Sequence, residues 1–330
     1  MPDVWTHIFC GREVLDRVEE DFRRAARENK KLFYYGCQGP DFFFYYNFLP
    51  WDEDNRGFLI GNQMHQENSH IFFLESLNYL RRNPDPGTIV YLMAFLCHWC
   101  LDRVTHPYIN YISGIYRGYK NEPRKLINNH KRVEAAIDVL MGQRLQNINV
   151  RRVPLHSEID VGDSLPGEIL AYYRHILPLA YRESYECMKG TEFVNKSYRD
   201  MITALRVLHD PWGVKRLLVS VYDSASKYTR NMRYFFYRAA ERNAEAYLNE
   251  ENRPWCHPFD PGEIYTDSFI DLFYRGVEES VEAVNLSLRF IRREAGEADL
   301  CEKIKDVSYA TGKPGPDRRA MVSFKPVLEE

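Results

Sequence analysis

The stretch Cys97–Tyr111, CHWCLDRVTHPYINY, contains three side chains that could do chemistry at steps of four residues: His98, Asp102 and His106. Residues four apart lie on one face of a helix, so the two imidazoles and the carboxylate would form one polar stripe. Polar or ionised groups on a buried helix are costly unless they are paired or bind a metal. A His/Asp pair at this spacing is usually a hydrogen-bonded pair, so the stripe alone leaves a structural pair and a metal site open.

Other parts of the chain repeat this combination of residue types. His130 and Glu134 stand four apart in NNHKRVEAAID, Asp41 ends the Gly-rich turn GCQGPD, and His65 begins HQEN. His7 lies near the N-terminus. Imidazole nitrogens combined with carboxylate oxygens are ligands that suit zinc. With these further groups, the sequence favours a zinc site over a structural pair.

Cys97 and Cys100 form a Cys-x-x-Cys pair in the same stretch. A redox pair normally begins a helix, where the helix dipole lowers the thiol pKa, whereas these two lie inside an apolar helical pattern. A zinc ribbon would need a second such pair, and the other cysteines of the chain supply none. The pattern favours two core cysteines, and thiol titration would reveal a redox role.

The four motifs GCQGPD, HQEN, HWCLDRVTHPY and HKRVE, in this chain order, resemble the zinc-dependent phospholipases C. The resemblance covers residues 1 to about 145 well, and the C-terminal half resembles the family only as further helices. Each motif is modest alone, but together they are fairly specific. The resemblance implies an all-α fold shared with fungal single-strand-specific nucleases. It also implies a zinc cluster that hydrolyses phosphate esters.

The resemblance implies about two to three zinc ions, or other divalent metals, bound by imidazoles and carboxylates. The first ion would be held by Asp41, His65, His98 and Asp102. The second would be held by His106, His130 and Glu134. A third would share Asp102 and add His7 and the N-terminal amine.

The amine ligand departs from the family pattern. In secreted members, processing exposes a Trp whose amine and carbonyl bind metal, but Trp5 lies too close to His7 to be its equivalent. Met1 precedes Pro2, a small residue after which the initiator Met is commonly removed. We therefore expect Pro2 to present a secondary amine as the ligand. The interval from His98 to His106 is also shorter than in the family.

Helices must position these groups, because period-2 alternation is scarce and its best case is residues 147–153. Pro107 should limit the most apolar helix, and Gly36, Gly39 and Pro40 should form a turn before Asp41. The fold class is all-α, with a single large multi-helix domain of the phospholipase C and single-strand nuclease type over residues 1–300. An irregular, loosely attached tail should follow over residues 301–330. Helices are expected over residues 13–31, 64–82, 88 to about 105, 122–146, 167–189, 196–208, 214–249 and 266–295.

Composition excludes several classes of protein. The net charge of −3 argues against a general binder of nucleic acids or anionic membranes. Seven cysteines without regular spacing make a disulfide framework improbable. No apolar run reaches the roughly 18 residues of a bilayer span, and the N-terminal residues lack signal-peptide features. We expect a cytoplasmic protein without a transmembrane segment.

These observations predict a zinc-dependent phosphoric ester hydrolase of phospholipase C type. Asp41 would be both a ligand and the carboxylate that orients or deprotonates the attacking water. The partner would be a phosphate-ester small molecule or a phospholipid head group, with no stable nucleic-acid complex, and the oligomeric state is not indicated. The aromatic run over residues 42–51 could line the substrate cleft or belong to the core. The alternatives are a soluble phosphatase or nuclease on the same fold, and a non-catalytic, metal-stabilised binding protein.

Overall fold

The computed structural model describes residues 4–49, 52, 54, 56–114, 128–188, 190–225, 231–238, 244–316 and 319–328 of the chain. Helices dominate this part, and its one sheet is a hairpin of β1 (Trp255–His257) and β2 (Asp260–Tyr265). The expected all-α class is therefore confirmed. The hairpin lies outside the expected elements.

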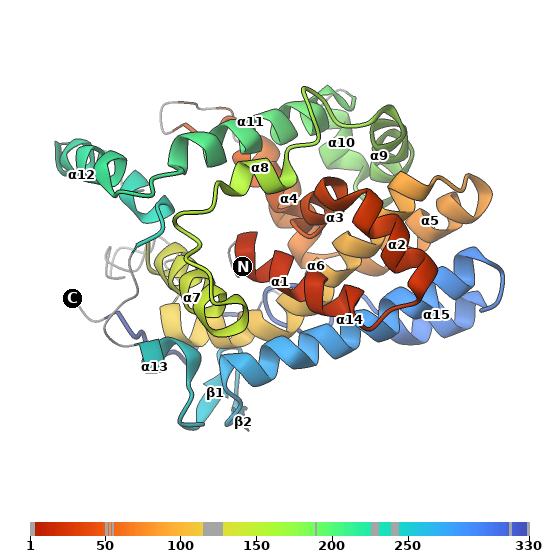
Figure 1. Ribbon diagram of the computed structural model, residues 1–330. Coiled ribbons are helices and arrows are strands. Elements are labelled where there is room, and N and C mark those ends of the chain that lie inside the picture. The colour runs from red at the N-terminus through yellow and green to blue at the C-terminus, as the bar shows by residue number, and fades with distance from the viewer. Residues whose placement is uncertain are drawn as a thin grey trace.

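The long helix α6 (Pro86–Ser113) forms the centre of the molecule (Figure 1). Residues 91–102 are all buried, as expected for a helix that is apolar on every side. The helices that contact it most are α1 (Val4–Leu15), α3 (Lys30–Gly36), α7 (Asn129–Gln146) and α14 (Phe269–Ile291). The polar stripe of α6 is therefore enclosed by other parts of the chain rather than exposed to water.

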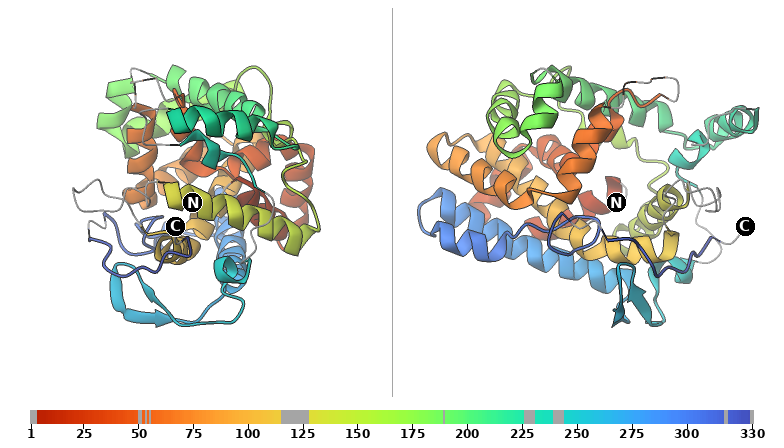
Figure 2. Two further views of the ribbon diagram at one scale, coloured as in Figure 1. Left: turned by 90° about the vertical axis from the view of Figure 1, so that its left-hand side faces the viewer. Right: turned by 180° about the vertical axis from the view of Figure 1, so that it is seen from behind.

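The remaining elements complete the body around this centre. α5 (Ser69–Arg82) packs on α9 (Gly167–Ala180), while α4 (Arg56–Gln66) and α11 (Glu192–Leu208) pack on the 3-10 helix η1 (Gly39–Tyr45). α12 (Val214–Ala225) stands away from the body at one end, next to η3 (Met232–Phe235) (Figures 1 and 2). The shorter helices are α2 (Glu20–Glu28), α8 (Leu155–Ile159), α10 (Arg182–Met188), α13 (Ala244–Leu248) and α15 (Glu297–Lys303).

Four expected helices are wrong in extent. Residues 13–31 do not form one helix, because α1 ends at Leu15 and α2 begins at Glu20. The helix expected over residues 64–82 is divided between α4 and α5 near Asn68, whose φ of 62° is left-handed. The helix over residues 167–189 is divided between α9 and α10. Residues 214–249 contain α12, η3 and α13 instead of one helix, and residues 226–230 and 239–243 lie outside the described part.

The remaining expected elements agree with the structure in part. The helices over residues 196–208 and 266–295 correspond to α11 and α14. A capping box begins α14, in which Asp271 N donates to Ser268 Oγ at 3.1 Å and Ser268 N donates to Asp271 Oδ2 at 2.9 Å. α7 begins at Asn129, and residues 122–127 of the expected helix lie outside the described residues. Residues 147–153 form turns rather than a strand.

Pro107 lies inside α6 and does not end it, which corrects a further expectation. A proline cannot donate to the carbonyl four residues earlier, which belongs to Arg103. Gly312 covers that carbonyl so closely that a Cβ on it would lie 2.5 Å from the oxygen, and its φ is 64°. The helix continues because Tyr108, Ile109 and Ile112 are buried in the core.

Residues 304–316, the C-terminal segment, are not loosely attached. Tyr309 N donates to the carbonyl of His65 at 2.8 Å, and Asn110 Nδ2 donates to the carbonyl of Ala310 at 2.8 Å. His257 Nε2–H donates to the carbonyl of Thr311 at 2.9 Å, so this histidine links the hairpin to the segment. Four of its side chains are buried: Ile304, Ser308, Tyr309 and Thr311.

Among the described residues, no helix is both long enough and apolar enough to cross a membrane.

The beginning of α1 is held by a carboxylate from a distant helix. Asp138 of α7 is fully buried, and its two oxygens accept hydrogen bonds from Trp5 N and Thr6 N at 2.8 Å each. They also accept from Thr6 Oγ1 at 2.6 Å and Tyr237 Oη at 2.7 Å. A carboxylate at a helix N-terminus satisfies backbone N–H groups that lack intrahelical partners. Asp138 therefore fixes the first turn of α1, which carries His7.

Replacing Asp138 should destabilise the protein, because Asp138→Ala leaves these buried donors without their acceptor. We expect the free energy of unfolding to fall by about 2–4 kcal/mol, measured by urea denaturation. The exposed Asp163 supplies the control, since Asp163→Ala should change it by less than about 0.5 kcal/mol. Equal stability of the two variants would contradict this role of Asp138.

Candidate metal centre

The structure brings the predicted ligands together from five elements. His7 comes from α1, Asp41 from η1 and His65 from the end of α4. α6 supplies His98, Asp102 and His106, while α7 supplies His130 and Glu134. Pro2 lies outside the described residues. Ligand atoms lie within 4.8 Å of one another in three groups: His7/His98/Asp102, Asp41/His65/His98 and His106/His130/Glu134.

Asp102 lies at the middle of the first two groups. Its Oδ2 atom is 3.1 Å from His98 Nε2 and 3.9 Å from His65 Nε2. Its Oδ1 atom is 3.3 Å from His7 Nε2. The side chains of His7, His98 and Asp102 have no exposed surface. One buried carboxylate is thus shared by imidazoles from three helices.

Asp41 closes the second group. Its Oδ1 atom lies 3.1 Å from His65 Nε2 and 3.8 Å from His98 Nε2. The Asp41 side chain keeps 13% of its surface exposed, whereas Asp102 keeps none. Of these two carboxylates, only Asp41 can reach water.

The third group lies where α6 meets α7. His130 Nε2 is 2.8 Å from Glu134 Oε1, and the rings of His106 and His130 stack with their centroids 5.9 Å apart. The His130 side chain is 36% exposed, whereas that of Glu134 is 6% exposed. The third group therefore opens towards solvent.

Backbone carbonyls orient three of the imidazoles. A carbonyl can only accept, so Nδ1–H donates in each case: His65 to Gly61 at 2.6 Å, His98 to Cys37 at 3.1 Å and His106 to Tyr309 at 3.0 Å. Metal-binding histidines usually donate their other ring N–H in this way, which fixes the ring and its tautomer. The arrangement leaves Nε2 of each ring as the possible metal ligand, and those of His65 and His98 face Asp41 and Asp102.

Gly39 permits the close approach of η1 to His98. Its φ is 52°, and a Cβ atom on it would lie 2.2 Å from His98 Cδ2. Only glycine tolerates both the left-handed conformation and this contact. The turn expected at Gly36, Gly39 and Pro40 thus brings Asp41 close to the imidazole of His98.

The oriented imidazoles create an electrostatic conflict. With Nδ1 protonated, the Nε2 lone pair of His98 points at the carboxylate oxygen of Asp102, and that of His65 points at Asp41. Within the described residues, His98 Nε2 and both oxygens of Asp102 are buried and have no hydrogen bond of adequate geometry. A cation between such atoms removes the repulsion, either as a second ring proton or as a metal ion.

The charge states of two groups favour the metal. Burial by itself raises the pKa of the Asp102 carboxyl, but His106, His98 and His7 outweigh it, so its pKa lies well below the usual range. Burial also holds the pKa of His106 well below 6.5, so this imidazole is neutral and offers a lone pair. A buried carboxylate surrounded by imidazole nitrogens is a set of ligands that suits zinc.

The sequence does not single out two residues that support the centre. Tyr309 belongs to a Gly/Pro-rich stretch, and its carbonyl orients His106 while its ring lies 4.9 Å from that of His65. A backbone carbonyl leaves no trace in a side-chain pattern. Asp138 follows Glu134 by four residues, so extending the stripe of His130 and Glu134 by one turn would have found it.

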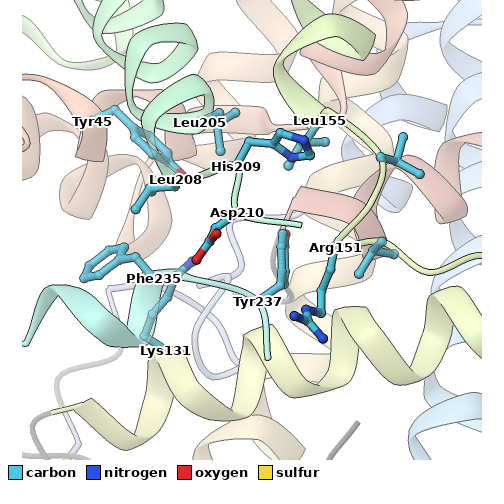
Figure 3. A pocket seen from close by; sticks show the side chains of 12 residues that line it. Tyr45, Lys131, Arg151, Leu155, Leu205, Leu208, His209, Asp210, Phe235 and Tyr237 are labelled. Carbon is cyan, nitrogen blue, oxygen red and sulfur yellow. The ribbon is translucent and has the colours of Figure 1, made fainter. Parts of the chain in front are cut away.

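A pocket lies beside the centre, at the junction of α7, α11 and η3 (Figure 3). Lys131 and Arg151 line it together with Tyr45, Phe235 and Tyr237. Lys131 follows His130 in the chain, and Tyr45 follows Asp41 by one turn. The aromatic run over residues 42–51 therefore divides, because Phe42 and Phe43 are core residues and Tyr45 lines the pocket. Pro50 and Trp51 lie outside the described residues.

The cysteines of α6 are packed away from this chemistry. Cys97 and Cys100 are fully buried, and Cys97 Sγ–H donates to the carbonyl of Met93 at 3.2 Å. Burial raises the pKa of Cys100 to about 11 and that of Cys97 well above its usual value. A redox thiol needs the opposite shift, so the interpretation as core cysteines stands.

Alkylation should distinguish buried from exposed thiols. Iodoacetamide at pH 8 should modify the exposed Cys187 and Cys301 in the folded protein. The buried thiols should react only after denaturation, because burial and a raised pKa suppress the thiolate; they are Cys10, Cys37, Cys97 and Cys100. Peptide mass mapping locates the adducts, and modification of Cys97 or Cys100 in the folded state would overturn this interpretation.

A comparison with known proteins shows which family the chain resembles. The family model described as zinc dependent phospholipase C matches residues 6–212, which is more than half of the chain and includes every predicted ligand except Pro2. No curated protein and no solved structure matches the chain. The C-terminal segment, which orients His106, lies beyond the matched residues. The chain belongs to the zinc-dependent phospholipase C family.

Proposed function

We propose that this chain hydrolyses phosphate esters as a zinc-dependent, phospholipase C-like enzyme. The observation that carries the proposal is the buried Asp102 carboxylate, which faces imidazoles of α1, α4 and α6 without a hydrogen-bond donor of adequate geometry in the described residues. Such a carboxylate is stable when it binds cations. Membership of the family supports a hydrolase.

The ligands divide between about two to three ions. Asp41, His65, His98 and Asp102 suit the first, and His106, His130 and Glu134 suit the second. His7 and Asp102 suit a third ion that would also need the N-terminal amine, which the proposal assigns to Pro2. Zinc bound at these positions would polarise the phosphoryl oxygens and lower the pKa of the attacking water.

The two carboxylates differ in their exposure to solvent and therefore in their proposed roles. Asp102 has no contact with solvent, so it serves only as a ligand. Asp41 is partly exposed and lies at the edge of the same cluster, so it can accept a proton from water or orient it. Lys131 and Arg151 place two positive charges in the adjacent pocket, where they attract an anionic phosphate ester.

Three substrates assayed side by side test the reaction class. Phosphatidylcholine, a bis-aryl phosphodiester and single-stranded DNA represent a lipase, a general phosphodiesterase and a nuclease. We expect hydrolysis of the first two and release of a phosphorylated head group from the lipid. Cleavage of DNA alone would indicate a nuclease on this fold. No turnover by a metal-loaded protein would indicate a metal-stabilised binding protein.

Removing the central charge should abolish activity. Asp102→Asn keeps the size of the side chain but loses the anion that the cluster shares, so bound zinc should fall by at least one ion per chain. We expect hydrolysis of the phosphodiester to fall at least about 100-fold. Asp163→Asn, which changes an exposed carboxylate, should keep wild-type metal content and activity. Full activity of Asp102→Asn would rule out the shared-carboxylate cluster.

A further inference from the structure

α12 carries a row of apolar side chains that nothing in the described structure covers. Leu217, Leu218 and Val221 are each 67% exposed, and Trp212 just before the helix is 82% exposed. Together with Val214 and Tyr222, which are also exposed, these residues form what we call the α12 face. A contiguous apolar patch of this kind marks an interaction site.

The α12 face is held in a fixed orientation. Lys215 Nζ donates to the carbonyls of Val207 and His209 at the end of α11, at 3.0 and 2.9 Å. Asp223 on the opposite side accepts from Met232 N and Arg233 N of η3, at 3.1 and 2.8 Å. The helix nevertheless projects from the body in two opposite views (Figures 1 and 2). Its apolar side therefore forms a convex, projecting surface.

The charges around this face have one sign. Asp210 and Asp223 are buried, and the Asp210 carboxylate accepts a hydrogen bond from Arg216 N at 2.9 Å. Lys215 is exposed and Arg216 is partly exposed. Over residues 210–225 the ionised groups that reach the surface are therefore cations, although the whole chain has a net charge of −3. An anionic partner complements this rim.

We propose that the α12 face docks on an anionic lipid surface, with the helix lying in the plane of the interface. A short amphipathic helix with large apolar residues on one side and basic residues beside them binds membranes in this way. Trp212 and Tyr222, at the two ends of the row, have rings that suit the boundary between lipid and water. The 12 residues of α12 are too few to span a bilayer.

The docking site adjoins the pocket beside the metal centre. Leu208, His209 and Asp210, which precede α12, line that pocket, as does Phe235 of η3 (Figure 3). α12 begins just after residue 212, where the family match ends. Docking requires no metal chemistry and stands independently of the proposed function.

Vesicle sedimentation with purified full-length protein tests the proposal. We expect the protein to sediment with phosphatidylcholine vesicles that contain phosphatidylserine, and to be released by high salt. Leu217→Asp should weaken this binding at least about tenfold. The matched control is Leu179→Asp on α9, where the leucine is 51% exposed and lies outside the α12 face. It should bind as the wild type does.

A second measurement reports docking by the wild-type protein itself, so it does not depend on whether a variant keeps its structure. Trp212 fluorescence should shift to shorter wavelength when the anionic vesicles are added, and Trp212→Phe should abolish the shift while keeping sedimentation within about threefold of wild type. The Asp102→Asn variant should still sediment, which separates docking from catalysis.

Three results would overturn the proposal. The first is an absence of sedimentation and of a fluorescence shift. The second is equal binding by Leu217→Asp and Leu179→Asp. The third is a concentration-dependent dimer, formed without lipid and abolished by Leu217→Asp, because it would identify the occupant as a second copy.

Discussion

The Asp102 carboxylate lies inside the central helix with no exposed surface, and imidazoles of His7, His98 and His65 face its two oxygens. Nearby imidazoles hold its pKa low despite burial, so the group is an anion in the interior. An unpaired buried charge costs several kcal/mol, and removing its partner typically costs about 3–5 kcal/mol. Much of the chain is arranged so that a cation can be held at this position.

The residues around Asp102 orient the imidazole nitrogens more than they neutralise the charge of its carboxylate. Carbonyls of Gly61, Cys37 and Tyr309 each accept Nδ1–H from one imidazole, so Nε2 of each ring keeps its lone pair for a metal. Gly39 allows η1 to approach His98, and Asp138 anchors the helix that carries His7. These contacts come from parts of the chain far apart in sequence. The same fold that supplies the proposed ligands thus also preorganises them.

The clustering of the proposed ligands is easier to predict from the sequence than the groups that orient them. His98, Asp102 and His106 can be read as one stripe because helical periodicity is local, and His130 with Glu134 follows the same rule. Helix ends are less readable. Pro107 stays inside α6, where Gly312, far away in the sequence, packs closely against the carbonyl of Arg103. The contribution of Tyr309 is made by its backbone, which no residue pattern reveals. The exposed row on α12 is visible as an amphipathic pattern, but only the structure shows that nothing in the described residues packs on it.

Metal content shows whether the Asp102 cluster holds metal ions. The protein should be purified without chelator or metal-affinity tag, and its metals should be counted per chain by plasma mass spectrometry. We expect about two to three zinc or similar divalent ions per chain. A chain that holds no metal, even after zinc has been offered and the excess removed, would contradict this expectation and would leave Asp102 and its imidazoles as a purely structural cluster.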